Sequence, residues 1–223
     1  MVIHDVSVWR KIGLDRYAEG GHRLTVQGSR DGTVPLNLEV LGDAHTRHYR
    51  GRAGLPASAT RPDWTVPTDL KPVPPDIYDG HMLFHGPRFQ AIQRVLGLSP
   101  SGGAAVLAGA HDLGWNRGIW HTDPAAVDGG LQLAVLWAKH VVGRAALPMG
   151  VAECRTYHAG LYDGPTRCVV RARNVWADAA ECDVVFIGPD GAVRTELLGV
   201  SLVMRPERQH AHASDPQLTR QGT

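Results

Sequence analysis

The stretch DPAAVDGGLQLAVLWAKHVVG, residues 123–143, has the pattern of one long helix. Asp123 suits the N-cap and Pro124 the first helical position. Apolar residues then recur at helical spacing, and Gly143 suits the C-cap. The pattern predicts a helix over about residues 124–142.

Asp128 and Gln132 interrupt the apolar pattern of this helix, with Gly129 and Gly130 between them. A carboxyl on an apolar helix face needs a hydrogen-bond partner or has a functional role, because burying it without a partner is unfavourable. Helical spacing brings Gln132 to the same face one turn later, so that it can orient the carboxyl. The alternative is that Asp128 supports the helix N-terminus through the macrodipole. The glycines weaken a helix by about 1 kcal/mol each relative to Ala, so we expect them to admit substrate or a neighbouring structural unit.

Two blocks of strands flank the helix. In residues 2–55, alternating patterns predict strands in VIHDVSVWRKI, HRLTVQG, VPLNLEVLG and AHTRHYRGRAGL, with Asp31-Gly32 as a hairpin turn. From residue 150, the same holds for GVAECRTYH, TRCVVRARNVW, ECDVVFIG and VRTELLGVSLVM. Each block has one strand, a gap and three antiparallel strands, which indicates one architectural unit used twice.

The two units differ in what precedes them. The second has the helix and, ahead of it, a hairpin formed by FQAIQRVLGLS and AAVLAGAH around PSGG. The first has neither, so we expect the chain to be a segment of a longer polypeptide. The predicted organisation is residues 1–55 as strands only, 56–80 as a proline-rich linker, 81–206 as a complete second unit and 207–223 as a disordered tail.

Composition narrows the class of protein. The chain is 43% hydrophobic with a formal net charge of +1, which disfavours nucleic acid or an anionic membrane as its main partner. Three separated cysteines lack metal-ligand spacing, and His210 with His212 is too little for a metal site. Without a secretory signal or a membrane-spanning run, a cytoplasmic protein is expected.

A long helix followed by antiparallel strands is the layout of an α+β hot-dog fold. Within it, DPAAVDGGLQ resembles the Asp-x-x-x-Gln/His motif of polyketide synthase dehydratase domains. FHGPRFQAI (residues 84–92) and LPMGVAECRTYHAG (residues 147–160) resemble two further motifs of that family. The resemblance covers residues 2–206 and implies a double hot dog with the second unit complete and the first truncated. The segment LFHGPRFQ (residues 83–90) is most similar to the corresponding segment in dehydratases of polyunsaturated fatty acid and enediyne synthases.

The resemblance implies an activity. Such domains are hydro-lyases that remove water from a 3-hydroxyacyl thioester on an acyl carrier protein and leave the 2-enoyl product. Asp128 matches the acid that protonates the departing hydroxyl, with Gln132 as its partner, and desolvation would raise the pKa of that acid. Substrate-contact candidates are His85, where the family has Tyr, then Phe89, which also suits a core role, and His121, just ahead of the helix.

The family's base is a histidine in a His-x-x-x-Gly-x-x-x-x-Pro motif, which these 223 residues do not contain. HVVGRAALP (residues 140–148) has one residue too few between His and Gly, and it marks the helix exit. We therefore expect the chain alone to be inactive.

The resemblance implies no metal or organic cofactor, because the phosphopantetheine belongs to the carrier protein. Expected partners are that carrier, other domains of a synthase and a second copy in a homodimer. Two alternatives stay open: a non-catalytic dehydratase-like scaffold or acyl-holding domain, and a hot-dog thioesterase. A histidine motif upstream of Met1 would favour the dehydratase over the scaffold.

Overall fold

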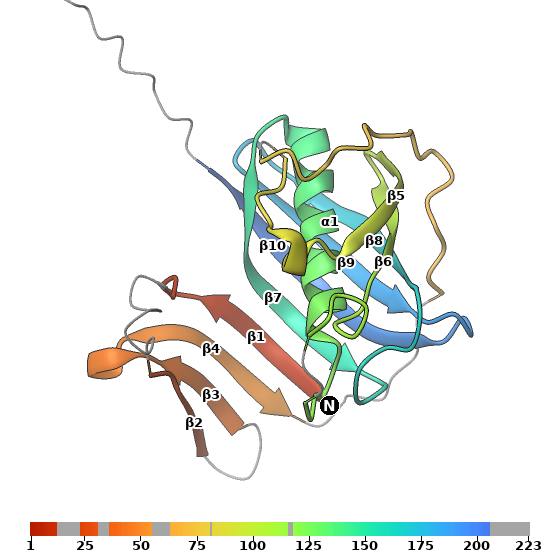
Figure 1. The fold of residues 1–223 in the computed structure, drawn as a ribbon. Helices are drawn as coiled ribbons and strands as arrows, with labels where there is room; N and C mark the ends of the chain where they lie inside the picture. Colours follow the sequence, from red (N-terminus) through yellow and green to blue (C-terminus); the bar gives the residue numbers. More distant parts are fainter. Residues whose placement is uncertain (13–22, 31–35, 55–62, 81, 116–117, 206–223) are drawn as a thin grey trace, which may run out of the picture.

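The computed structural model describes residues 1–12, 23–30, 36–54, 63–80, 82–115 and 118–205 (Figure 1). They form one antiparallel sheet, of which the strands of the second unit wrap a single long helix, and this confirms the predicted hot-dog fold class. The sheet order is β2-β3-β4-β1-β7-β10-β9-β8-β6-β5. The elements are β1 (Val2–Val8), β2 (Thr25–Arg30), β3 (Leu36–Leu41), β4 (Arg47–Gly54), β5 (Ile92–Ser99), β6 (Gly102–Leu107), α1 (Pro124–Val142), β7 (Ala146–Thr156), β8 (Thr166–Val175), β9 (Ala179–Ile187) and β10 (Val193–Met204), with short 3-10 turns at Asp43–His45 and Pro87–Phe89.

The repeated unit is visible in the strand pairing. In the first block β1 pairs with β4, the last strand of the block, and in the second β7 pairs with β10. The blocks join through β1 and β7, where Ile3 lies opposite Cys154. β2 and β3 pair as the hairpin prediction requires, although the predicted Asp31-Gly32 turn itself lies outside the described residues. One pattern of strand order thus serves both blocks.

The helix α1 has the bounds that its sequence predicts. The Asp123 carboxylate accepts hydrogen bonds from the backbone N–H groups of Ala125 and Ala126, and Gly143 ends the helix at φ 79°. Such caps satisfy backbone groups that a helix end leaves without partners. The buried face of α1, including Leu133 and Trp137, packs on the sheet and builds the main hydrophobic core.

Gly129 and Gly130 serve the packing of α1 on its own sheet, and not the approach of substrate or of the neighbouring unit that we expected. A Cβ at Gly129 would lie 2.9 Å from the Cβ of Ala91, and one at Gly130 would lie 2.4 Å from the ring of Phe186. Both glycines are buried. They bring the helix axis close to the sheet.

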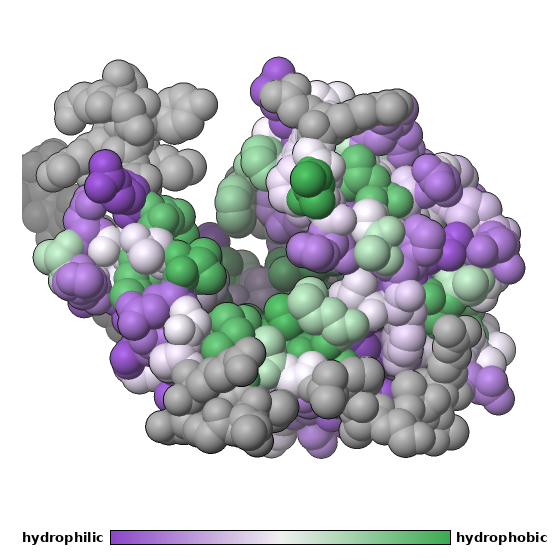
Figure 2. All heavy atoms as spheres, turned by 90° about the horizontal axis from the view of Figure 1, so that it is seen from below, coloured by the Kyte–Doolittle hydropathy of each residue, from purple (hydrophilic) through white to green (hydrophobic). Residues whose placement is uncertain are grey.

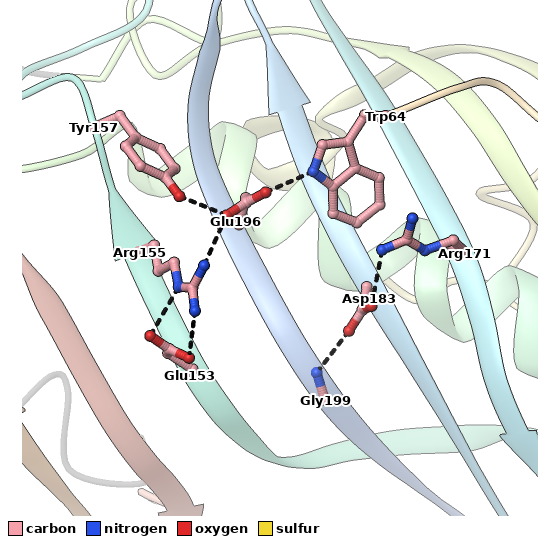
Figure 3. Close-up of polar contacts among 8 residues, drawn as sticks. All are labelled: Trp64, Glu153, Arg155, Tyr157, Arg171, Asp183, Glu196 and Gly199. Carbon is pink, nitrogen blue, oxygen red and sulfur yellow. Dashed lines mark hydrogen bonds and ion pairs between the residues drawn. The ribbon is translucent and has the colours of Figure 1, made fainter. Parts of the chain in front are cut away.

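The described part of the linker, residues 63–80, forms no helix and no strand beyond a single bridge between Lys71 and Leu98. Near its start, Trp64 lies on the sheet face away from α1 (Figure 3). The Trp64 indole N–H donates to Glu196, a carboxyl that is 1% exposed and also accepts from the Tyr157 hydroxyl. The Arg171 guanidinium lies 4.3 Å from the centre of the Trp64 ring. These contacts fix the path of the chain between the blocks.

Two further expectations concern the ends of the chain and the membrane. The predicted disordered tail, residues 207–223, lies outside the described residues. Within the described residues, no helix combines the length and apolar character needed to cross a membrane.

Candidate active site

A cavity of about 740 Å³ lies where the first block meets the second hot dog. That volume falls in the range of small-molecule sites. In Figure 2 a hollow separates the two parts of the molecule, with hydrophobic residues on both sides. The end of β1 and the chain after it form one wall of the cavity, and α1 forms another. The end of the linker and the start of β7 close the remaining sides of the cavity. Its apolar lining includes Val8, Trp9, Tyr49, Met82, Leu83, Leu131, Val135, Leu147 and Met149.

Asp128 and Gln132 both line this cavity, side by side on α1. Gln132 Nε2 donates to Asp128 Oδ2 at 2.7 Å and to the backbone carbonyl of Phe89 at 2.7 Å. Gln132 is 2% exposed, so its side chain has little freedom. The predicted pairing on one helical face is therefore present, and it holds the carboxyl in one orientation.

Burial in the cavity wall raises the pKa of the Asp128 carboxyl. The hydrogen bond from Gln132 and the nearby His85 act in the opposite direction but do not cancel the desolvation. The Asp128 side chain keeps 39% of its surface accessible. The N-terminal N–H groups of α1 are capped by Asp123, so Asp128 is not needed to satisfy them. A carboxyl with a raised pKa that faces a cavity is suited to acid catalysis.

Tyr78 completes the support of this carboxyl and was not found by sequence reasoning. Its hydroxyl donates to Gln132 Oε1 at 2.7 Å and accepts from the backbone N–H of Ile92 at 2.8 Å. Burial, with a contribution from the charge of Asp128, raises the pKa of Tyr78 to about 12, so the hydroxyl remains a donor. Tyr78 lies 54 residues from Gln132 in a linker without regular pattern, and no local signal marks it.

His85 is the one histidine among the described residues that line the cavity. Its Nε2 lies 4.0 Å from Asp128 Oδ2, and 18% of its side chain is exposed. Phe84 stacks on its ring with 4.7 Å between ring centres. Of the three predicted substrate-contact residues, His85 is the one that the fold brings to Asp128.

Phe89 and His121 lie apart from the cavity lining. The Phe89 ring is 48% exposed and packs edge-on against Trp115, while its backbone carbonyl receives the bond from Gln132. His121 is exposed ahead of α1. Their predicted contacts with substrate remain predictions without support from this geometry, and Phe89 contributes to the site through its backbone.

Three exposed cations lie among the cavity-lining residues: Arg10 and Lys11 after β1, and Arg205 after β10. Arg205 is placed over the Phe84 ring, 5.7 Å from its centre. Within the described part of the chain, none of the three forms an ion pair. The cavity therefore combines an apolar wall with positive charge. No group of three His, Cys, Asp or Glu side chains among the described residues is arranged to hold a metal ion.

The fold and the cavity together define a hot-dog protein with a carboxyl-based site between a helix and a second strand block. Comparison with solved structures gives the same architecture. A dehydratase domain of a mycocerosic acid synthase-like polyketide synthase aligns with a TM-score of 0.70 at 18% identity, over 93% of this chain and 75% of that one. A monomeric dehydratase domain from a trans-AT polyketide synthase split module aligns with a TM-score of 0.70 at 12% identity, over 92% and 81%. A trans-AT polyketide synthase dehydratase domain from Brevibacillus brevis gives 0.69 at 13% identity, over 92% and 76%.

At these identities the structural likeness shows the fold. The family model for the polyketide synthase dehydratase N-terminal domain matches residues 57–212, well over half of the chain. The chain belongs to the polyketide synthase dehydratase family. No curated protein sequence matches it. The narrower resemblance to dehydratases of polyunsaturated fatty acid and enediyne synthases stays a prediction.

Proposed function

We propose that this chain carries the acid half of a dehydratase site, which removes water from a 3-hydroxyacyl thioester held on an acyl carrier protein. The observation that carries the proposal is the Asp128 carboxyl in the cavity wall, with its pKa raised by burial and its orientation held by Gln132. Membership of a dehydratase family makes a hydro-lyase the first choice of enzyme class.

In the acyl chain the proposed reaction breaks the C2–H and C3–O bonds and forms the C2–C3 double bond, while the base gains one proton and Asp128 gives up another. A base removes a proton from C2, the electron pair of that C–H bond forms the C2–C3 double bond, and the C3–O bond breaks. Asp128 gives its proton to the departing oxygen, which leaves as water. Gln132 and Tyr78 hold the carboxyl in place and do not exchange protons with the substrate. The apolar lining accommodates the acyl chain.

The cations near the cavity supply a binding feature for the carrier-bound substrate. The phosphopantetheine arm carries a phosphodiester, and Arg10, Lys11 and Arg205 are exposed around the same cavity as Asp128. Arg and Lys are the side chains that bind phosphate. We assign these three residues to the phosphate of the arm, which leaves the thioester and the hydroxyl to reach Asp128.

The test is dehydration of a 3-hydroxyacyl thioester on a carrier protein, followed by mass spectrometry. The chain is assayed alone and together with a polypeptide that carries a His-x-x-x-Gly-x-x-x-x-Pro motif, because its own 223 residues contain none. We expect turnover in the second case and none in the first. Turnover by the chain alone would contradict the assignment of the base to that motif.

Asp128→Asn is expected to lower the rate by about 10²- to 10⁴-fold, because an amide cannot protonate the leaving oxygen. Gln132→Ala should have a smaller effect, since the acid itself remains. Circular dichroism checks that both variants are folded. A rate for Asp128→Asn equal to that of the parent would refute Asp128 as the acid and leave a scaffold role as the better explanation.

A further inference from the structure

His85 is held by its neighbours in one ring orientation. Phe84 stacks on one face of the imidazole, and the Tyr78 ring lies edge-on with 6.5 Å between ring centres. Gln90 Nε2 donates to the backbone carbonyl of His85 at 3.0 Å, which fixes the chain on its other side. Because the ring orientation is fixed, each of the two ring nitrogens has a defined environment, and the two environments differ.

Nδ1 of His85 is buried and has no hydrogen-bond partner among the described residues. Nε2 faces Asp128 Oδ2 at 4.0 Å, and both residues line the cavity. A proton on Nδ1 would be a buried N–H group without an acceptor, which is unfavourable. A proton on Nε2 points toward a carboxyl and an accessible space. The neutral imidazole therefore carries its proton on Nε2.

The gap between His85 and Asp128 has the size of one bridging atom. A distance of 4.0 Å is too long for a direct hydrogen bond. An oxygen atom placed between Nε2 and Oδ2 lies within ordinary hydrogen-bond distance of both, roughly 2.8 Å from each. Oδ2 already accepts from Gln132, so the carboxyl keeps its position when the oxygen enters.

We propose that His85 is a catalytic hydrogen-bond donor, whose Nε2–H binds the same substrate oxygen that Asp128 protonates, the 3-hydroxyl of the acyl chain. This rests on the proposed function. As the C3–O bond breaks, negative charge grows on that oxygen, and a second fixed donor stabilises it. His85 does not act as the base at C2, because Nε2 would then need a free lone pair and Nδ1 a buried proton.

The first test reads the tautomer of His85 directly by ¹⁵N NMR of histidine-labelled chain, with His85→Gln used to assign the signals. We expect the neutral imidazole to carry its proton on Nε2 and to leave Nδ1 unprotonated. Addition of 3-hydroxybutyryl pantetheine should shift the Nε2 signal, whereas butyryl pantetheine, which lacks the hydroxyl, should not. A protonated Nδ1, or equal shifts with the two ligands, would overturn the proposal. This test needs no turnover, so it stands apart from the proposed function.

The second test uses two amides in the dehydrating protein, that is, this chain with the polypeptide that supplies the histidine motif. The side-chain nitrogen of Gln reaches the place of Nε2, and that of Asn the place of Nδ1. His85→Gln should retain activity within about tenfold, whereas His85→Asn should lose about 10²- to 10³-fold in kcat, the loss typical of a missing donor to a charged oxygen. Equal losses in both variants would sink the proposal. Failure of Asp128→Asn to impair the reaction would instead count against the proposed function.

Discussion

At the scale of single residues, the site depends on one carboxyl that the fold makes harder to ionise. Asp128 lies among apolar neighbours of the cavity, and its remaining contacts with Gln132 and His85 offset only part of the desolvation. A carboxyl whose desolvation exceeds its favourable contacts lowers the stability of the folded protein when it is ionised. Natural sites often retain such residues because the reaction needs them.

The stability of Asp128→Asn should consequently depend on pH in a particular direction. The folded protein binds the Asp128 proton more tightly than the unfolded chain, because the pKa is raised on folding. The resulting penalty is absent below the unfolded pKa of about 3.9 and is complete above the folded pKa. Relative to the parent, Asp128→Asn should therefore gain in Tm as the pH rises from about 4 to 8. Differential scanning calorimetry at several pH values measures this.

Asp190→Asn is the control, because folding shifts the pKa of Asp190 in the direction opposite to that of Asp128. Hydrogen bonds from Ala192 and the guanidinium of Arg194 lower the pKa of this exposed carboxyl. Its stabilising contribution is present above the unfolded pKa and is lost as the pH falls through the folded pKa. This variant should thus lose slightly in Tm at neutral pH. A Tm of Asp128→Asn that falls relative to the parent as the pH rises would contradict the raised pKa.

At the scale of elements, the position of α1 on the sheet depends on how closely the two can approach as well as on their hydrophobic contacts. Gly130 faces the Phe186 ring, and Gly129 faces Ala91 and Leu107. The carboxyl of Asp128 is next to these glycines in the chain, so its depth in the cavity depends on how closely α1 approaches the sheet. The close approach of α1 to the sheet thus depends on two glycines, although glycine is a weak helix former.

Gly130→Ala tests this arrangement. Helix propensity alone predicts a gain of about 1 kcal/mol. The structure predicts a loss instead, because the new Cβ would lie 2.4 Å from the Phe186 ring, which is fully buried and has little room to move. Overpacking of this kind costs about 1–3 kcal/mol. Urea unfolding measures this loss, and Gly86→Ala, which lies outside α1 and whose Cβ would meet nothing within 4 Å, is the control for a Gly→Ala change without a clash. A more stable Gly130→Ala would contradict the packing argument.

At the scale of the whole molecule, the first block presents apolar surface and an unpaired sheet edge. Val26 is 71% exposed and Trp9 is 56% exposed. β2 is the terminal strand of the sheet, and no described strand pairs with its outer edge. Exposed edges and apolar patches promote association.

The chain is therefore expected to self-associate as its concentration rises, through the β2 edge. Val26→Lys should shift light-scattering mass toward the monomer, since a charged residue on an edge strand opposes pairing. Val203→Lys is the matched control, because Val203 is 49% exposed but lies on β10, an interior strand of the sheet. A monomer at every concentration, or an equal effect of both changes, would contradict an interface at β2.

Much of the fold was predictable because its signals are local. The α1 bounds follow from Asp123, Pro124 and Gly143, whose caps act within one turn. The strands follow from their alternation, and the pairing of Asp128 with Gln132 follows from the helical period. Family motifs added the reaction class, and the matching family model agrees with it.

The amino-acid sequence by itself determined the helix, the strand blocks and the helix face that carries Asp128, since each depends on neighbours within a few positions. Only the tertiary structure decided that Tyr78 supports Gln132, that His85 faces Asp128 and that Phe89 turns its ring away. It also decided that Gly129 and Gly130 serve the core. These relations join segments that are distant in the chain, and they arise from close packing, which no local periodicity encodes.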